Sequence, residues 1–489
     1  MGKCRLKVYG ALLSAMILLG AGCGGGRPVA FELPGTADYS DLGWVEAFDS
    51  MHLKMSKEYA FTEWRGVDRD RKSEDFRPLV EEAEKEDDIR AYYLALRQYL
   101  FSIPDGHVAL QTGKSFYDDL GIRQEEVGGA FGMTVSLLDD GRLVADRVEE
   151  GGPAGAAGME AGAVIIEWDG MPAGRALRET STIWSPVPQA TDAGRDYERT
   201  RFMVRAPVGG ARGMTFLDPG GEQVTVSLTA VDDGMEALKK TDVYGTGFSG
   251  IPIEKTIEGR QLKGNIGYIR IYVEVDKPDR IATLDQFSGM IEDFEASGVH
   301  GLVIDLRGNM GGADAMAAGF LGPFCDEKTF YEYQSWYNRA SGEMEIVLMD
   351  ETGEATRDAG LYIEPAPLRF TGRVVALINP GCISSGEGVA MGIRNLGSSE
   401  VVGFRGTNGS FGMVMGPVIE MPGGYSIRYP VGQSLDRNRM VQVESNGREG
   451  GVTPTVTVPM TMENALRSAS GVDVELEYAL KNTECETGL

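Results

Sequence analysis

Residues 374–396 read VVALINPGCISSGEGVAMGIRNL, and this stretch decides the fold of the region around it. The apolar run at 374–378 predicts a buried strand, Asn-Pro-Gly ends it, and a glycine- and alanine-rich helical pattern follows two serines. A serine at a strand-to-helix turn holds its hydroxyl beside the free N–H groups of the first helical turn, where an oxyanion can be stabilised. Ser384 or Ser385 is therefore either a nucleophile or only the N-cap of the helix. Cys382 is interpreted as a small packing residue beside the turn.

Strand and helix patterns also alternate upstream of this stretch. Strands are expected at 267–271 and 302–306, and helices at 279–297 and 313–321. Such alternation is typical of an α/β fold with a largely parallel sheet. Residues 325–369 interrupt the rhythm with short polar pieces, which predict a lid or an edge hairpin.

A glycine-rich segment, Gly-Asn-Met-Gly-Gly at 308–312, follows the second of these strands. Its backbone is free to turn N–H groups inward, as an oxyanion hole requires. The segment has neither the G-x-G-x-x-G pattern nor a P-loop, so phosphate binding is not favoured. The alternative is that these glycines only turn the chain.

The composition limits the partners of this chain. Its 489 residues predict two to four domains, and a net charge of −26 argues against nucleic acid or an anionic membrane surface as a partner. Five cysteines are too few and too scattered for a disulfide framework or a metal cluster. We expect no metal and no cofactor, and the composition leaves the oligomeric state open.

The first 23 residues have the pattern of an export signal. Basic residues precede an apolar stretch that is too short to span a membrane comfortably, and small residues ending in Cys23 close it. This ending resembles a bacterial lipobox, although Gly20 stands where leucine is usual. The resemblance implies lipidation of Cys23 and a protein tethered to the membrane at the bacterial cell envelope, on its periplasmic or extracellular face. An ordinary secretory signal is the alternative.

Two further modules precede the α/β region. A helical pattern covers 42–103 and ends at Pro-Asp-Gly, after which 107–110 is extended. Residues 126–232 resemble a PDZ domain in their Gly-Pro-Ala helix start and Gly-Ala-Val-Ile-Ile strand, with 180–205 as an apparent insertion. A PDZ domain binds extended peptide ends by strand addition. The resemblance places its carboxylate-binding loop at Ala130, Phe131, Gly132 and Met133.

A serine nucleophile needs a base, commonly histidine or lysine. The chain has three histidines, His52, His107 and His300. Of these, His107 follows Asp-Gly at a turn, from which its ring can point into a cleft. No lysine lies within 50 residues of Ser384, since none occurs between Lys328 and Lys481. A nearby Ser–Lys dyad is therefore excluded, and histidine is the favoured base.

Together, these motifs resemble the C-terminal processing (tail-specific) serine peptidases and their tricorn-like relatives. Over about residues 42–465, the chain contains, in this order, the PDZ-like module, GYIRI, LVIDLRGNMGG, NPGCISSGE and GGVTPT. The processing peptidases carry a lysine where this chain reads GFRGTNG at 403–409, so the tricorn-like branch with a histidine is favoured.

The resemblance implies a multidomain α+β and α/β protein whose core has ClpP/crotonase-like sheet and helix layers. It also implies catalytic and oxyanion-hole residues. For the acidic catalytic residue, implied to be Glu444, the alternatives are Glu449, Asp436 and Glu387. The implied catalytic residues are Ser384, His107 and Glu444, and the implied oxyanion hole is Gly311, Gly312 and Ser385.

The predicted organisation is a signal (1–23), a tether (24–40), a helical subdomain (41–125), a PDZ-like domain (126–232), a peptidase core (233–465) and a C-terminal tail or helix (466–489). The expected function is an exported serine endopeptidase that cleaves unfolded or C-terminally exposed polypeptides through an acyl-enzyme. One alternative is a lipoprotein that binds peptides or apolar ligands without catalysis. Hydrolysis of small esters by the same residues is another.

Overall fold

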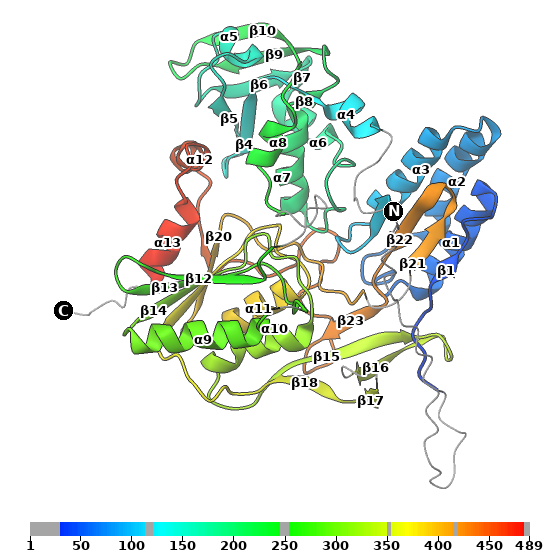
Figure 1. The fold of residues 1–489 in the computed structure, drawn as a ribbon. Coiled ribbons are helices and arrows are strands. Elements are labelled where there is room, and N and C mark those ends of the chain that lie inside the picture. The colour runs from blue at the N-terminus through cyan, green and yellow to red at the C-terminus, as the bar shows by residue number, and fades with distance from the viewer. Residues whose placement is uncertain are drawn as a thin grey trace, which may run out of the picture.

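The computed structural model describes residues 30–112, 121–244, 254–278, 280–349, 354–414 and 418–483. The predicted signal, with Cys23, lies outside the described residues. Figure 1 shows a central sheet with helices on it, a second domain above it and a helical subdomain beside it. No helix within the described ranges is long and apolar enough to cross a bilayer.

A six-stranded sheet forms the centre of the molecule, in the order β12-β13-β14-β19-β20-β24. Its strands are parallel except for β12, which pairs antiparallel with β13. The strands are β12 (Ile257–Leu262), β13 (Ile266–Ile271), β14 (Gly301–Asp305), β19 (Arg373–Leu377), β20 (Glu400–Gly403) and β24 (Val456–Thr457). The strands and helices expected for the α/β region are therefore confirmed.

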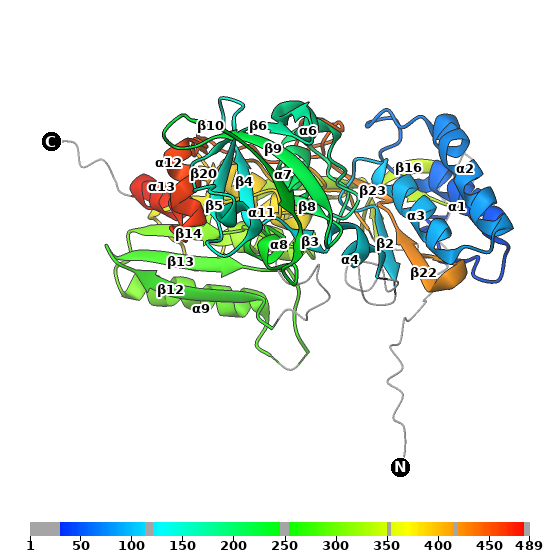
Figure 2. The same ribbon diagram turned by 90° about the horizontal axis from the view of Figure 1, so that it is seen from above.

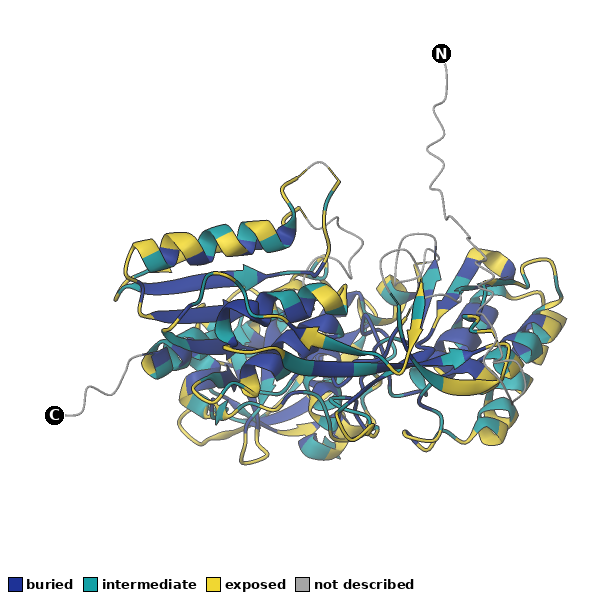
Figure 3. Ribbon diagram, turned by 90° about the horizontal axis from the view of Figure 1, so that it is seen from below, coloured by how far each residue is buried: buried dark blue, intermediate teal, exposed yellow. Residues whose placement is uncertain are grey.

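Both faces of this sheet are buried, which explains why its strands are continuously apolar. Ile304 and Ala376 pack on one face with side chains from α9, α10 and α11, whereas Val303 and Val375 pack on the other with α13. These helices and their neighbours are α9 (Thr283–Ala296), α10 (Asp314–Leu321), η2 (Gly322–Phe324), α11 (Ser385–Arg394), α12 (Met462–Ala469) and α13 (Val474–Thr483). Figure 3 shows the buried strands between these layers.

The second domain is built on a sheet in the order β10-β9-β6-β5-β4, with β7 paired to β6 and a small sheet β11-β3-β8 beside it. Its strands are β3 (Gly129–Ala130), β4 (Met133–Leu137), β5 (Leu143–Val148), β6 (Val164–Trp168), β7 (Met171–Pro172), β8 (Arg205–Ala206), β9 (Ala211–Leu217), β10 (Gln223–Thr229) and β11 (Val231–Asp232). Its helices are α4 (Ile122–Val127), α5 (Pro153–Ala156), α6 (Ala173–Glu179), α7 (Asp192–Met203) and α8 (Glu236–Lys240). The apparent insertion at 180–205 contains α7, which packs on β4.

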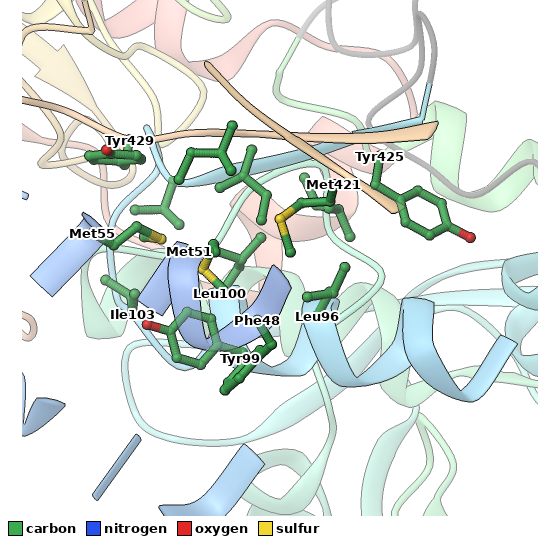
Figure 4. Close-up of a cluster of buried hydrophobic side chains, with 14 of the residues drawn as sticks. Phe48, Met51, Met55, Leu96, Tyr99, Leu100, Ile103, Met421, Tyr425 and Tyr429 are labelled. Carbon is green, nitrogen blue, oxygen red and sulfur yellow. The ribbon is translucent and has the colours of Figure 1, made fainter. Parts of the chain in front are cut away.

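The N-terminal subdomain joins helices to a sheet from the other end of the chain. Its helices are α1 (Trp44–Glu58), α2 (Arg69–Lys85) and α3 (Ile89–Phe101). Its sheet has the order β1-β21-β22-β2 and consists of β1 (Ala37–Asp38), β2 (Ala109–Thr112), β21 (Val418–Met421) and β22 (Tyr425–Arg428), with η3 (Pro422–Gly424) between the last two. Met421 and Tyr425 pack against Met51 and Leu96 in one core (Figure 4). The subdomain predicted to be helical, with an extended segment at 107–110, therefore also contains a sheet whose other strands come from both ends of the chain.

The polar segment at 325–369 forms a further sheet and not an isolated hairpin. The sheet has the order β17-β16-β15-β18, and β23 also pairs with β15. Its strands are β15 (Thr329–Asn338), β16 (Glu343–Met349), β17 (Ala355–Arg357), β18 (Gly360–Ile363) and β23 (Gly432–Leu435). Seen from above, β16 and β23 run beside the helical subdomain (Figure 2).

Candidate active site

Ser384 stands at the turn between β19 and α11, in a backbone conformation that is rare for a residue with a side chain. Its φ is 59° and its ψ is −135°, and its hydroxyl makes no capping hydrogen bond to the helix. Its N–H donates to the carbonyl oxygen of Ser410 at 2.9 Å. Strained residues of this kind cluster at functional sites. The structure therefore does not support a capping role for the Ser384 side chain.

Ser385 and Cys382 are both engaged in the structure around this turn. The Ser385 hydroxyl lies 2.8 Å from the Gly312 carbonyl oxygen and 2.7 Å from Asp314 Oδ1. Cys382 is fully buried, and burial raises the pKa of its thiol well above the ordinary value. Ser384 is thus the side chain of the three that is left to react.

The glycine-rich loop after β14 lies directly against Ser384. A Cβ atom on Gly311 would stand 2.4 Å from the Ser384 Cβ, and the φ of Gly311 is +78°. The Gly311 N–H donates to Asn309 Oδ1 at 2.8 Å, so it is not available as an oxyanion donor. Within the described residues, the N–H groups of Gly312 and Ser385 have no hydrogen-bond acceptor. Of the three predicted oxyanion-hole donors, the N–H groups of Gly312 and Ser385 are therefore the two that can still bind an oxyanion.

Asn309 fixes the loop to the turn that carries Ser384. The amide Nδ2 of this fully buried residue donates to the Ile271 carbonyl oxygen at 3.0 Å and to Glu274 Oε1 at 2.7 Å. Its backbone carbonyl oxygen accepts from the Ile383 N–H at 3.0 Å. The side chain of Asn309 therefore connects β13 to the glycine-rich loop, and its backbone carbonyl connects this loop to the residue before the nucleophile candidate.

His107 and Ser384 line the same cavity, which has a volume of about 1010 Å³. The His107 side chain is 10% exposed, and burial lowers its pKa from 6.5 to about 4, with opposing effects of Asp105, which raises it, and Arg65, which lowers it. A neutral imidazole is the form that can accept a proton. No hydrogen bond joins the two side chains in the part of the chain described here, and such bonds are often long in resting enzymes.

The other two histidines lie elsewhere. His52 is in α1, where its Nδ1 is 2.9 Å from the Tyr99 hydroxyl, and His300 is exposed before β14. Neither lines the cavity. Of the histidines considered from the sequence, only His107 shares a cavity with the nucleophile candidate.

Glu444 does not contact His107. One of its oxygens accepts from Arg65 Nη2, and the other accepts from the Phe411 N–H at 2.7 Å. The carboxylate beside the imidazole belongs to Asp105, whose Oδ1 lies 3.9 Å from His107 Nδ1. Asp105 and Arg65 are not among the site residues predicted from the sequence. Asp105 belongs to the Asp-Gly pair that precedes His107, whereas no sequence signal marks Arg65.

Comparison with known proteins shows which family this part of the chain resembles. Residues 265–458 match the sequence model of peptidase family S41. These residues form a region similar to S41 peptidase domains, hereafter the S41 domain. This confirms the resemblance read from the motifs.

The sequence relative and the similar solved structures all match at low identity. The carboxy-terminal processing protease CtpB of Bacillus subtilis (strain 168) is 23% identical over 294 residues, 60% of this chain and 48% of that protein. The chain thus spans about half the length of this curated relative. Mature CPAF has a TM-score of 0.61 at 14% identity, over 90% of this chain and 96% of that chain. A putative peptidase from Parabacteroides merdae has a TM-score of 0.50 at 15% identity, over 91% of this chain and 98% of that chain.

The three alternatives to Glu444 occupy different places around the S41 domain. Glu449 follows an Asn446-centred turn, and Asp436 holds a turn through the N–H groups of Asn438 and Met440. Glu387 is fully buried in α11, and burial raises its pKa to about 7. None of them contacts His107 in the described structure.

Glu387 holds a loop that connects the two halves of the site. Its carboxylate accepts from the N–H groups of Gly409 and Ser410, at 2.8 and 2.9 Å. The Ser410 carbonyl oxygen accepts from Ser384, and its hydroxyl accepts from the Gly106 N–H at 2.8 Å. Ser410 thus contacts both the nucleophile candidate and the residue before His107.

Arg405 lies in the segment 403–409, where the processing peptidases carry a lysine, and its side chain faces away from the site. Its guanidinium donates to the Leu137 carbonyl oxygen at 3.3 Å and lies 3.4 Å from Asp139, both in the second domain. It therefore joins the S41 domain to β4 and cannot act on Ser384.

The predicted peptide-binding residues lie at one end of a groove. The groove, of about 240 Å³, is lined by residues 134–137 of β4, by Tyr197 and Thr200 of α7 and by Val204, which follows this helix. Phe131 and Met133 are buried in the core of the second domain. Gly132 accepts from the Glu149 N–H through its carbonyl oxygen. The predicted loop borders the groove and is not part of its lining.

Proposed function

We propose that this protein is an exported serine endopeptidase that cleaves unfolded or C-terminally exposed polypeptides through an acyl-enzyme. The observation that carries the proposal is that the free Ser384 hydroxyl and the neutral His107 ring line one large cavity. Two unengaged N–H groups, of Gly312 and Ser385, adjoin the same serine. Nucleophile, base and oxyanion donors are the parts that acyl transfer needs.

In the proposed reaction, His107 accepts the proton of the Ser384 hydroxyl as its Oγ attacks the scissile carbonyl carbon. The N–H groups of Gly312 and Ser385 stabilise the negative charge that forms on the carbonyl oxygen. The imidazolium then gives its proton to the leaving amine, and the C–N bond breaks. Water, activated by His107, attacks the acyl-enzyme and releases the second product and Ser384.

The walls of the cavity favour apolar segments of an extended chain. Its lining includes Met310, Trp336, Met349, Ile383, Phe411 and Met413. A folded domain cannot reach Ser384 inside such a cavity, whereas an unfolded segment can. Apolar side chains gain free energy by leaving water, so we expect cleavage next to them.

The second domain is proposed to hold the substrate as a PDZ domain does. β4 is the last strand of its sheet, and a peptide added to its open edge would lie between β4 and α7. The name of the Bacillus relative, carboxy-terminal processing protease, supports a preference for chain ends. Lipidation at Cys23 would tether the protein to the membrane at the cell envelope.

Labelling with a serine-directed phosphonate tests the proposal. We expect the wild type to be labelled, and Ser384→Ala and His107→Ala to lose labelling and cleavage of an unfolded protein. The matched controls are Ser297→Ala and His300→Ala, which change exposed residues outside the cavity and should behave as the wild type. Peptide capture without labelling of the wild type would favour the non-catalytic binding protein. Ester turnover without proteolysis would favour a small-molecule hydrolase.

A further inference from the structure

The environment of His107 contains two carboxylates and one guanidinium, all buried. The Asp105 and Arg65 side chains are 0% exposed, and that of Glu444 is 1% exposed. Arg65 stands between the two acids, with its Nε 3.6 Å from Asp105 Oδ2 and its Nη2 bonded to Glu444. The guanidinium therefore separates Glu444 from the carboxylate that is next to the imidazole.

The contacts of Asp105 fix it beside the His107 ring. Asp105 Oδ1 accepts from the backbone N–H of His107 at 2.9 Å, and Asp105 Oδ2 accepts from the Tyr59 hydroxyl at 2.7 Å. His107 Nδ1 is buried and has no hydrogen-bond partner among the described residues. Asp105 Oδ1, at 3.9 Å, is the acceptor that a small ring movement would bring within reach.

We propose that Asp105 is the positioning residue for His107, and that Glu444 acts on the imidazole only through Arg65. The proposal rests on the role of His107 as general base. If Nδ1–H faces Asp105, the lone pair of Nε2 faces the cavity, which is the tautomer that can accept the Ser384 proton. Arg65 also donates to the carbonyl oxygens of Pro104 and Gly409, so it attaches the histidine loop to the S41 domain.

The charges of this cluster suit the reaction. Two carboxylates and one guanidinium leave one negative charge beside His107, which an imidazolium would neutralise during catalysis. Glu444 balances Arg65, and Asp105 is thereby free to stabilise the imidazolium. The remaining charged groups of the cavity lining are Asp314 of α10 and Arg428 of β22, and both stay constant in the test below.

Nitrogen-15 NMR of histidine-labelled protein tests the proposal independently of activity. Only three histidine signals exist, and His107→Ala assigns the relevant one. Arg65→Gln removes a positive charge beside the ring while the burial that mainly lowers the pKa remains, so we expect the pKa of His107 to rise from about 4. Adding Asp105→Asn should cancel this rise, whereas adding Glu444→Gln should leave it. His52 and His300 are internal controls whose pKa values should not move.

The single variants provide a second measurement that retains Arg65. We expect Asp105→Asn to lower kcat by about 100-fold or more with little change in KM, and Glu444→Gln to lower kcat less. Cancellation of the pKa rise by Glu444→Gln and not by Asp105→Asn would overturn the proposal. So would a larger loss of kcat in Glu444→Gln. If the phosphonate fails to label Ser384 while the pKa pattern holds, the proposed function fails and only the interaction of Asp105 with the His107 ring stands.

Discussion

At the scale of single residues, the candidate site depends on a glycine that touches Ser384. Gly311 has a φ of +78°, and a Cβ there would overlap the Ser384 Cβ at 2.4 Å. Neither the backbone nor the neighbouring side chain has room for another residue. This close approach explains the glycine better than flexibility does.

Gly311→Ala should therefore inactivate the protein beyond any loss of stability. The backbone strain costs about 1–2 kcal/mol, and displacement of Ser384 should lower kcat by about 100-fold. Gly141→Ala is the matched control, since its φ is +84° but its Cβ would meet nothing within 4 Å. We expect this control to lose similar stability in denaturant unfolding and to keep its kcat. Equal activity in the two variants would contradict the account.

At the scale of elements, the groove lined by β4 and α7 also includes a lysine. Lys240 of α8 lines the groove, and its Nζ lies 3.4 Å from Glu149, whose N–H donates to the Gly132 carbonyl oxygen. A peptide lying along β4 would bring its terminal carboxylate towards Gly132, and so towards this lysine, if the loop acts as in PDZ domains.

Lys240→Glu should weaken binding of a peptide with a free C-terminus. Charge reversal near the carboxylate should raise Kd by about 10-fold, and an amidated peptide should be affected less. Lys239→Glu is the matched control because Lys239 is more exposed, pairs with Glu236 and does not line the groove. Fluorescence anisotropy with the full chain bearing Ser384→Ala measures both without cleavage. Equal effects of the two reversals would remove the groove from the proposal.

At the scale of the whole molecule, burial of acids near the centre makes folding depend on pH. Glu274 is fully buried, and burial raises its pKa from 4.5 to about 8; Glu387 and Asp314 are raised to about 7 and about 6. The folded state therefore keeps these protons at pH values where the unfolded chain has lost them. Their contribution to stability is lost as the pH rises through this window.

The free energy of unfolding should thus fall between about pH 6.5 and about pH 8.5. His107 has little effect on the slope over most of this range, because its pKa is lowered from 6.5 to about 4 and it is mostly neutral in both the folded and the unfolded state. Glu274 alone should account for roughly 2 kcal/mol of that fall, at 1.36 kcal/mol per pH unit up to its pKa. Glu274→Gln should flatten the dependence, and Glu292→Gln, on the exposed face of α9, should not. Denaturant unfolding at several pH values measures the slope. An unchanged slope in Glu274→Gln would contradict the assignment.

The sequence predicted the α/β core because its strands and helices carry their own local signal. The apolar runs that became β14 and β19 are buried on both faces, and the glycines and serines between strand and helix mark the turn of Ser384. The predictions were weaker where distant segments pair. No motif in residues 418–428 predicts that β21 and β22 form a sheet with β1 and β2.

The sequence by itself predicted the family resemblance, the serine turn and His107 as the candidate base, since each rests on a short motif or on the missing lysines. Only the tertiary structure decided which carboxylate lies beside the imidazole. Arg65 and Glu444 are 379 positions apart, and their contact depends on how the helical subdomain packs on the core. Local sequence fixes backbone conformation over a few residues, whereas the field at a buried ring is set by all the charges that packing brings around it.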